Sequence, residues 1–214
     1  MRRHRNSLGY RIGHDGEAMI VEGRDDQGNI VSIYDAQRGA SQGLRCECKA
    51  ELVAKQGDEL SWHFAHSNNQ SGACAAATKA TALRFIRKVL EDAGAITLPE
   101  LDHTVRVQSI HSLVAEGYGD FPIHTVRGDP LDELAIVSKL KKKSSASIME
   151  RARRKNIAVM EIALHTFRSQ SDEEIAEAII DIAPRKWLHR GIGIHAQMMR
   201  IPRDIDAIRR GLGF

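Results

Sequence analysis

The residues of this chain best suited to chemistry are its three cysteines, which all fall in one 29-residue window. Cys46 and Cys48 form a C-x-C pair, and Cys74 closes the window. Between them lie two histidines, His63 and His66. Three thiolates and one imidazole complete a tetrahedral Cys₃His zinc site. Because such a site leaves no position for water, we expect a structural zinc ion that helps a small, loop-rich segment to fold.

The fourth ligand of this site has two candidates, since only one imidazole is needed beside three thiolates. If residues 63–66 formed a helical turn, His63 and His66 would be three residues apart on one side of it. His66 is favoured because it lies nearer Cys74, and because Phe64 can pack inward from the same turn. His63 is then a core histidine or a hydrogen-bond partner of a ligand.

Length and composition place the chain among globular proteins with a small module and a larger domain. It has 214 residues, of which 42% are hydrophobic and 28% charged, which supports a packed core and argues against disorder. The net charge of +3 does not by itself indicate nucleic acid. No apolar stretch is long enough to cross a bilayer. Clustered thiols without an export signal favour a reducing compartment, so we expect a cytoplasmic protein with no membrane partner.

Hydrophobic periodicity and turn residues predict an alternation of strands and helices. Alternation predicts a β-hairpin over 18–35 and a short strand at 52–54. The helical period predicts helices over 76–93, 146–156 and 171–182. Extended segments are expected at 96–109, 111–126, 132–140 and 157–164, and a short helix at 203–210.

Three local signals fix where these helices start or stop. Gly94 is expected to end the first helix and Asn156 the second. Ser171 and Glu174 have the spacing of a capping box at the start of the third. Arg127–Pro130 reads as a turn between two extended segments. A helix that returns the chain to a strand after three strands predicts an α/β fold with a mixed sheet.

Several short motifs in the first part of the chain resemble the competence protein CoiA-like family. They are Arg45-Cys46-Glu47-Cys48, Leu52-Val53-Ala54-Lys55-Gln56-Gly57, His63-Phe64-Ala65-His66, Cys74 and Thr81-Ala82-Leu83. The resemblance implies a β-rich zinc module joined to a nuclease-like domain of the PD-(D/E)XK type, with a mixed sheet and flanking helices. On this basis we expect the module over 1–75, the nuclease-like domain over 76–190, and a tail with a short helix over 191–214.

The resemblance also implies a nuclease site, which this sequence fills only in part. Asp120 stands where the family places a metal-binding aspartate, and Lys139 where it places a lysine. Val137 occupies the position of the expected glutamate, and a valine cannot bind Mg²⁺. The first helix has Ala80 and Arg84 where a glutamate and a histidine are expected. We therefore expect a degenerate nuclease fold, in which Asp120 and Lys139 are catalytic only if the protein is active.

Basic residues gather in two places. Eight of them lie within residues 139–155: Lys139, Lys141, Lys142, Lys143, Arg151, Arg153, Arg154 and Lys155. A smaller group lies on the first predicted helix and includes Lys79, Arg84, Arg87 and Lys88. Ser145 or Ser147 could cap the second helix and present its amides to an anion. Such clusters favour contacts to the phosphate backbone of a nucleic acid rather than to its bases.

These features predict a protein that binds nucleic acid, with DNA as the expected partner, zinc as structural ion and little nuclease activity. One alternative is an active Mg²⁺-dependent nuclease with displaced carboxylates, in which Glu116 or Glu161 would complete the site. The other is an adaptor or inhibitor that uses the same scaffold to bind a protein. The apolar residues of the tail over 191–214 indicate a protein partner or self-association through that segment.

Overall fold

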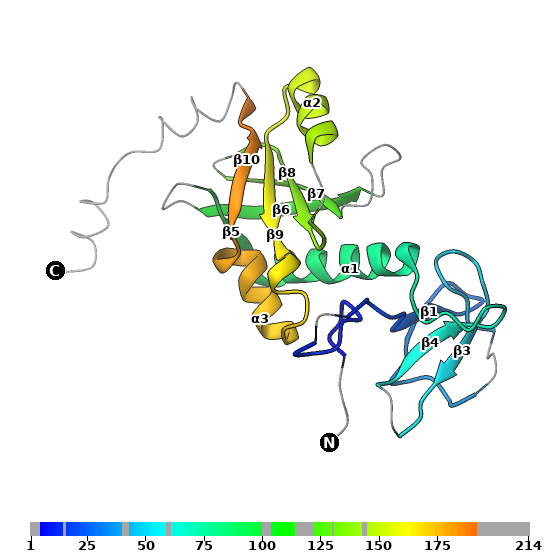
Figure 1. The fold of residues 1–214 in the computed structure, drawn as a ribbon. Helices are drawn as coiled ribbons and strands as arrows, with labels where there is room; N and C mark the ends of the chain where they lie inside the picture. The colour runs from blue at the N-terminus through cyan, green and yellow to red at the C-terminus, as the bar shows by residue number, and fades with distance from the viewer. Residues whose placement is uncertain are drawn as a thin grey trace.

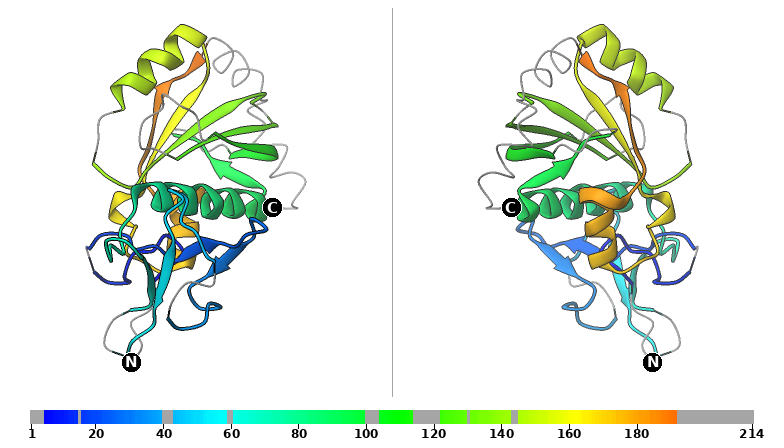
Figure 2. Two further views of the ribbon diagram at one scale, coloured as in Figure 1. Left: turned by 90° about the vertical axis from the view of Figure 1, so that its right-hand side faces the viewer. Right: turned by 90° about the vertical axis from the view of Figure 1, so that its left-hand side faces the viewer.

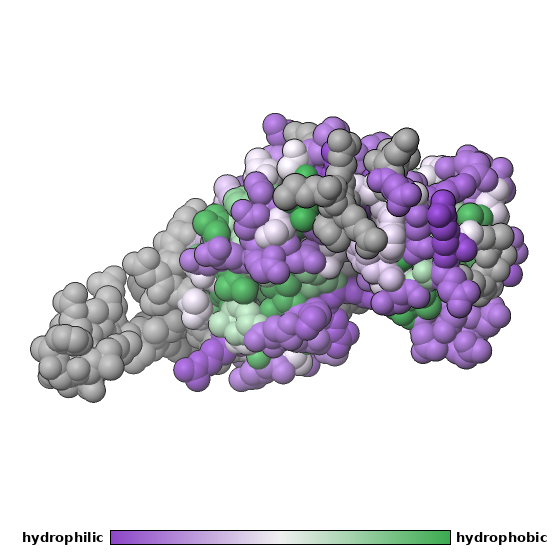
Figure 3. All heavy atoms as spheres, turned by 90° about the horizontal axis from the view of Figure 1, so that it is seen from below, coloured by the Kyte–Doolittle hydropathy of each residue, from purple (hydrophilic) through white to green (hydrophobic). Residues whose placement is uncertain are grey.

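The computed structural model describes most of the chain from residue 5 to residue 191 (Figure 1). The described ranges are 5–14, 16–39, 43–58, 61–99, 104–113, 122–129, 131–142 and 145–191. Within them, the structure contains no helix that is both long and apolar enough to pass through a membrane. Figure 3 shows one face of the molecule, on which hydrophilic residues predominate and separate the apolar areas.

Two small antiparallel sheets form the amino-terminal module. Strands β1 (Glu22–Arg24) and β2 (Ile30–Ser32) pair across a turn in which the Asp25 carboxylate accepts hydrogen bonds from Asn29. Strands β3 (Leu52–Lys55) and β4 (His63–His66) form the second sheet. The hairpin and the short strand expected from the sequence are therefore confirmed.

The module has its own small core. Its buried side chains come from strands β3 and β4 and from the segments that flank the strands, and Ala77 on the following helix joins them. The members of this cluster are Ile20, Val21, Ile33, Ala36, Leu44, Cys46, Leu52, Ala54, Phe64 and Ala77. Because Ala77 belongs to this core, the start of the helix is packed against the module.

Helix α1 (Ala75–Ala93) connects the module to the larger sheet. Its buried residues follow the helical period, as in Leu83, Ile86 and Leu90. Gly94 ends the helix with a φ of +63°, a conformation that glycine adopts without strain, and its amide donates to the Leu90 carbonyl. Both the helix and its stop residue agree with the sequence prediction.

A six-stranded mixed sheet forms the body of the protein. Its strands are β5 (Ala95–Thr97), β6 (Thr104–Leu113), β7 (Ile123–Asp129), β8 (Leu134–Lys139), β9 (Val159–Ala163) and β10 (Arg185–His189), in the order β10-β9-β8-β7-β6-β5. All neighbours are antiparallel except β8 and β9, which helix α2 (Ala146–Lys155) connects as a parallel pair. The mixed α/β class predicted from the sequence is confirmed.

Helices cover the two faces of this sheet unequally (Figures 1 and 2). Helix α1 and helix α3 (Asp172–Glu177), which continues as a π-helical segment (Ala178–Ile182), contribute to the large core on one face. Helix α2 covers the other face over a smaller apolar cluster. Asn156 ends α2 with a left-handed φ of 51°, and Ser171 and Glu174 form the expected capping box.

The amino-terminal segment packs on the body rather than on the small core of the module. Leu8 and Tyr10 belong to the large core. The Asn6 amide donates to the carbonyls of Arg168 and Gln170 at 2.7 and 2.8 Å. The expected division of the chain at residues 75 and 190 stays a prediction.

Two details differ from the sequence prediction, and a third cannot be compared with it. Arg127–Asp129 continue strand β7 instead of forming a turn. The strand β10 was not expected, because its polar residues Arg185, Lys186 and His189 give it no clear apolar face. The helix predicted over 203–210 lies outside the described residues.

Candidate functional site

The structure brings the predicted sulfur ligands together with one histidine. One ligand atom from each of Cys46, Cys48, His66 and Cys74 lies within 4.8 Å of all the others. The Sγ atoms of Cys46 and Cys74 are 3.6 Å apart, and the Cys48 Sγ lies 3.4 Å from the His66 Nε2. These four side chains therefore lie close enough to bind one metal ion.

The separations and the donor types both suit zinc. A tetrahedral zinc ion, with bonds of about 2.3 Å to sulfur and 2.0 Å to nitrogen, holds its ligands roughly 3.3–3.8 Å apart. In the protein alone, burial raises the pKa of the Cys46 thiol to about 12, with neighbouring thiols contributing. Burial also acts to raise the pKa of Cys48, but hydrogen bonds from the Ala50 amide and from thiols outweigh it, so the pKa is lowered. Since metal ligands bind as thiolates, ion binding must release protons here.

Local backbone geometry places the ligands. A tight turn follows Cys46, whose carbonyl accepts a hydrogen bond from the Lys49 amide, and Lys49 has a left-handed φ of 71°. His66 ends β4 in register with Leu52 on β3. Cys74 is the residue immediately before α1 and has extended backbone angles.

The choice between the two histidines follows from β4. Residues 63–66 form a strand and not the helical turn considered from the sequence. Side chains alternate along a strand, so His63 and His66 point to opposite faces. The His63 Nδ1 lies 3.0 Å from the Ser61 carbonyl oxygen, and burial lowers the pKa of His63. His66 is thus the histidine of the cluster, as the sequence favoured.

A residue between the two cysteines connects the cluster to helix α1. Glu47 lies 2.8 Å from a guanidinium nitrogen of Arg84 and 3.0 Å from one of Arg24. Arg84 also pairs with Glu22 of β1 at 2.5 Å. Burial acts to lower the pKa of Arg84, but Glu22 and Glu47 outweigh it and raise the pKa. Arg84 therefore connects α1 to the module, and its predicted contact with nucleic acid stays a prediction.

A second group of polar residues surrounds Glu161 on the α2 face of the sheet. Its side chain is only 6% exposed, and its Oε1 lies 3.6 Å from the Nζ of Lys139 and 3.5 Å from that of Lys186. The Ser145 hydroxyl donates to the other oxygen. Ser145 precedes α2, but its hydroxyl makes no capping hydrogen bond, so the expected cap is not formed.

The register of the sheet places Glu161 beside the position where the nuclease pattern expects a carboxylate. Val137 on β8 is the direct partner of Glu161 on β9. Partners in a ladder point to the same face, so Glu161 lies next to the valine. Asp120, the other expected metal ligand, lies outside the described residues, as does Glu116.

A basic cleft opens between the amino-terminal segment, the loop that follows β8 and the loop that follows β9. It has a volume of about 760 Å³, and none of its described lining residues is acidic. Lys141 and Lys142 contribute from one side, and His165 and Arg168 from another. The remaining lining residues are Gly13, His14, Thr166, Ser169 and Gln170. Lys141 and Arg168 also line a neighbouring cavity of about 440 Å³ that reaches Cys74.

The other predicted nucleic-acid contacts do not join this cleft. Lys88 is exposed on α1 and pairs with Asp92 at 2.6 Å. Arg153 and Arg154 are exposed on α2, where Arg154 pairs with Glu150 at 3.0 Å. Lys143 lies outside the described residues. Sequence reasoning missed His165 and Arg168, which no charge run or motif singled out.

Comparison of the chain with family models, with curated proteins and with solved structures finds no match. The resemblance to CoiA-like proteins therefore stays a prediction from the motifs of the sequence.

Proposed function

We propose that this protein binds the phosphate backbone of a nucleic acid in its basic cleft, and that a structural zinc ion holds the module, whose ligand Cys74 lines the cavity next to the cleft. The observation that carries this proposal is the lining of the cleft. Lys141 and Lys142 are exposed and form no ion pair within the described part of the chain. None of the described residues that line the cleft is acidic, and Glu17 lines only the neighbouring cavity that Lys141 also reaches. Phosphates are the anions that such a concave positive surface attracts most strongly.

The arrangement of elements is compatible with the nuclease-like scaffold that the sequence suggested. Helix α1 is followed by four antiparallel strands, β5 to β8, then by helix α2 and by strand β9, which is parallel to β8. The loops after the parallel strands β8 and β9 both line the cleft. Ligands of α/β sheets commonly bind outside the carboxyl ends of such strands. We propose a PD-(D/E)XK-like fold used for binding, with DNA as the expected partner.

The test measures the affinity for short single-stranded and duplex DNA and RNA as a function of salt. Replacing Lys141 and Lys142 by glutamine should weaken binding and reduce the slope of log K against log salt. For two lost contacts to a single strand, the reduction is about 1.4. The matched control is Lys55→Gln, an exposed lysine on β3 that does not line the cleft.

Two outcomes would contradict the proposal. One is affinity that does not depend on salt. The other is an equal effect of the cleft variant and the Lys55→Gln control. If instead nucleic acid binds negligibly at physiological salt while a stoichiometric protein partner is recovered, the adaptor alternative is supported.

The second candidate function is Mg²⁺-dependent cleavage of nucleic acid, and the position of the Glu161 carboxylate favours it. This carboxylate lies beside Val137 and near Lys139, where it could bind Mg²⁺ in place of the glutamate that the nuclease pattern expects at position 137. It is the weaker candidate because two lysines and a serine already engage both carboxylate oxygens.

Cleavage assays with Mg²⁺ and Mn²⁺ separate the two functions. If the protein is a nuclease, Glu161→Gln, Asp120→Ala and Lys139→Ala should each abolish a metal-dependent activity. If it only binds, no cleavage should appear, and Asp120→Ala should leave the affinity unchanged.

A further inference from the structure

A groove lies between helix α2 and the sheet, on the face away from α1. It has a volume of about 330 Å³, within the range of small-molecule sites. Its floor is aliphatic and includes Ile123, Val137 and Val159, all of them buried. None of its described lining residues is aromatic, and its volume is too small for a second helix.

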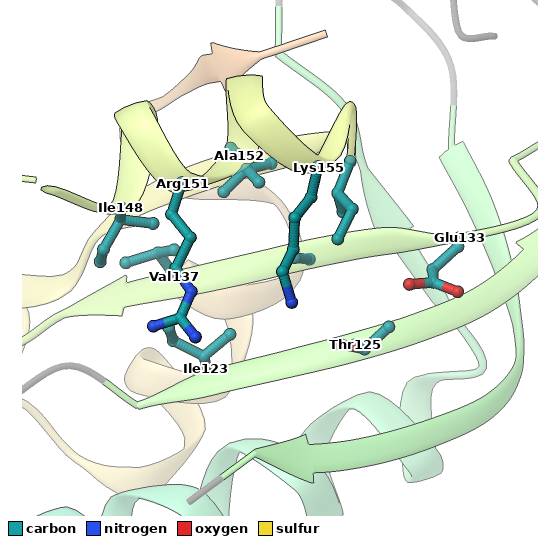
Figure 4. A pocket seen from close by; sticks show the side chains of 11 residues that line it. Ile123, Thr125, Glu133, Val137, Ile148, Arg151, Ala152 and Lys155 are labelled. Atoms are coloured by element: carbon teal, nitrogen blue, oxygen red, sulfur yellow. The ribbon is translucent and has the colours of Figure 1, made fainter. Parts of the chain in front are cut away.

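The side of α2 that lines the groove is not purely apolar. Ile148, Arg151, Ala152 and Lys155 have the spacing of a single helical stripe, and all four line the groove. Figure 4 shows the side chains of Arg151 and Lys155 descending from α2 toward the strands, with their nitrogen atoms at the lower ends. Two cations therefore lie over an aliphatic floor.

The other end of the groove has the opposite character. Glu133 precedes β8, and Thr125 lies on β7 as the partner of Ala135 (Figure 4). The Oε2 of Glu133 lies 3.6 Å from a guanidinium nitrogen of Arg127, and both side chains are well exposed. The second carboxylate oxygen of Glu133 can still accept a hydrogen bond.

This polarity restricts the occupant. A ligand must place an anionic group near Arg151 and Lys155, apolar surface over Val137, and a hydrogen-bond donor near Glu133. An alkyl carboxylate would satisfy the first two demands but would make no contact with the second carboxylate oxygen of Glu133, the one that does not face Arg127. A nucleotide whose base carries an exocyclic amino group satisfies all three, since carboxylates accept hydrogen bonds from the N4 amine of cytosine.

We infer that this groove binds a single unstacked nucleotide with an amino-bearing base, its phosphate held by Arg151 and Lys155 and its base edge by Glu133. The inference rests on the proposed function to the extent that the nucleotide belongs to a bound strand. A base taken out of its stack needs an apolar slot of this kind. Lys155 and the phosphate-binding cleft then contact the same strand at different points.

The experiment compares deoxycytidine monophosphate with deoxythymidine monophosphate, each titrated into the full chain and followed by calorimetry. Thymine lacks the exocyclic amine, so the cytidine nucleotide should bind at least about fivefold more tightly. Glu133→Ala should remove this preference, and Lys155→Gln should weaken both nucleotides. Arg153→Gln, on the same helix but outside the groove, is the matched control and should have no effect.

Oligonucleotides of cytidine and of thymidine then separate this inference from the proposed function. Strand binding that depends on Lys141 and Lys142 but ignores the base, with no binding of the free nucleotide, would overturn the groove and leave the cleft in place. Binding of the free cytidine nucleotide without any strand binding would support the groove and contradict the cleft. Preference for decanoate over both nucleotides would overturn the groove as a nucleotide site.

Discussion

The module and the sheet body depend on different sources of stability. Among the described residues, the core of the module contains ten buried apolar side chains, whereas the large core of the body contains 24. The module's two sheets have two strands each, and the body's sheet has six. Isolated two-stranded sheets are at best marginally stable in water. A region with so little buried apolar surface needs a further constraint, and a metal ion bound by Cys46, Cys48, His66 and Cys74 would supply one.

The largest expected effect is loss of the metal centre. Cys46→Ser or Cys74→Ser should abolish binding of about one zinc ion per chain and unfold the module, because structural zinc contributes directly to folding. Metal analysis and amide hydrogen exchange measure the two consequences. Exchange should rise by orders of magnitude in β3 and β4 and far less in β8 and β9, whose cores do not include the ligands.

A matched control for this comparison is His63→Asn, which alters a half-buried histidine of the same strand that is not in the cluster. It should retain zinc, whereas His66→Asn should lose affinity for it. Wild-type protein that carries no zinc after purification and reconstitution would contradict the claim that the module, unlike the body, depends on a metal ion for its stability.

A moderate effect is expected where the two regions meet. Arg84→Met and Glu47→Gln each remove the ion pair between α1 and the loop of the C-x-C pair. Their side chains are 30% and 24% exposed, so a double-mutant cycle should give a coupling of about 1–2 kcal/mol. Chemical denaturation of the zinc-loaded protein measures it. Lys88→Met, which breaks an exposed pair on α1, should have no measurable effect.

A coupling near zero would mean that the pair of Arg84 with Glu47 does not stabilise the junction. The metal centre, the pair of Arg84 with Glu22 and the packing of Ala77 would then hold α1 to the module.

The smallest effect is a pH dependence located in the body. His124 is fully buried on β7, and its Nε2 atom lies 2.9 Å from the carbonyl oxygen of Leu83. Burial lowers the pKa of His124, and Arg87 adds to the effect. The unfolded chain therefore takes up a proton first as the pH falls below about 6.5. Stability is fully present above that pH and declines below it, by at most about 1.4 kcal/mol per pH unit.

Denaturation midpoints of the zinc-saturated protein between pH 7.5 and 6.0 measure this dependence. His124→Gln should flatten the profile, because an amide can still donate to the Leu83 carbonyl without titrating. His111→Gln, at an exposed position of β6, should leave the profile as it is. An unchanged slope in His124→Gln would assign the dependence to the module, where burial lowers the pKa of His63 as well.

The two regions also differ in how much of their structure could be predicted from the sequence. Cysteine spacing was enough to predict the cluster of sulfur and histidine ligands, since these residues lie close together in the sequence. Apolar periodicity was enough to predict helices α1 and α2, and Gly94 and Asn156 predicted where they end. Strand β10 was missed because its residues alternate weakly, and its pairing with β9 is decided by tertiary packing.

The basic cleft was predictable only in part. Lys141 and Lys142 belong to a run of lysines over residues 139–143, which predicts a basic surface. His165 and Arg168 do not, because only the folded chain brings their loop beside residues 13 and 14. The hydrogen bonds from Asn6 to this loop show how that approach is made. A site assembled from distant loops leaves no local pattern in the sequence.

Cys74 is at once the last sulfur ligand and the residue that starts α1. Every ligand of the cluster therefore emerges from the ribosome before the first strand of the large sheet. Since chains fold from the amino terminus as they are synthesised, an ion captured at that stage would fix the beginning of α1 while the body is still being translated. Zinc supply during synthesis, rather than after release, would then govern the yield of correctly assembled protein.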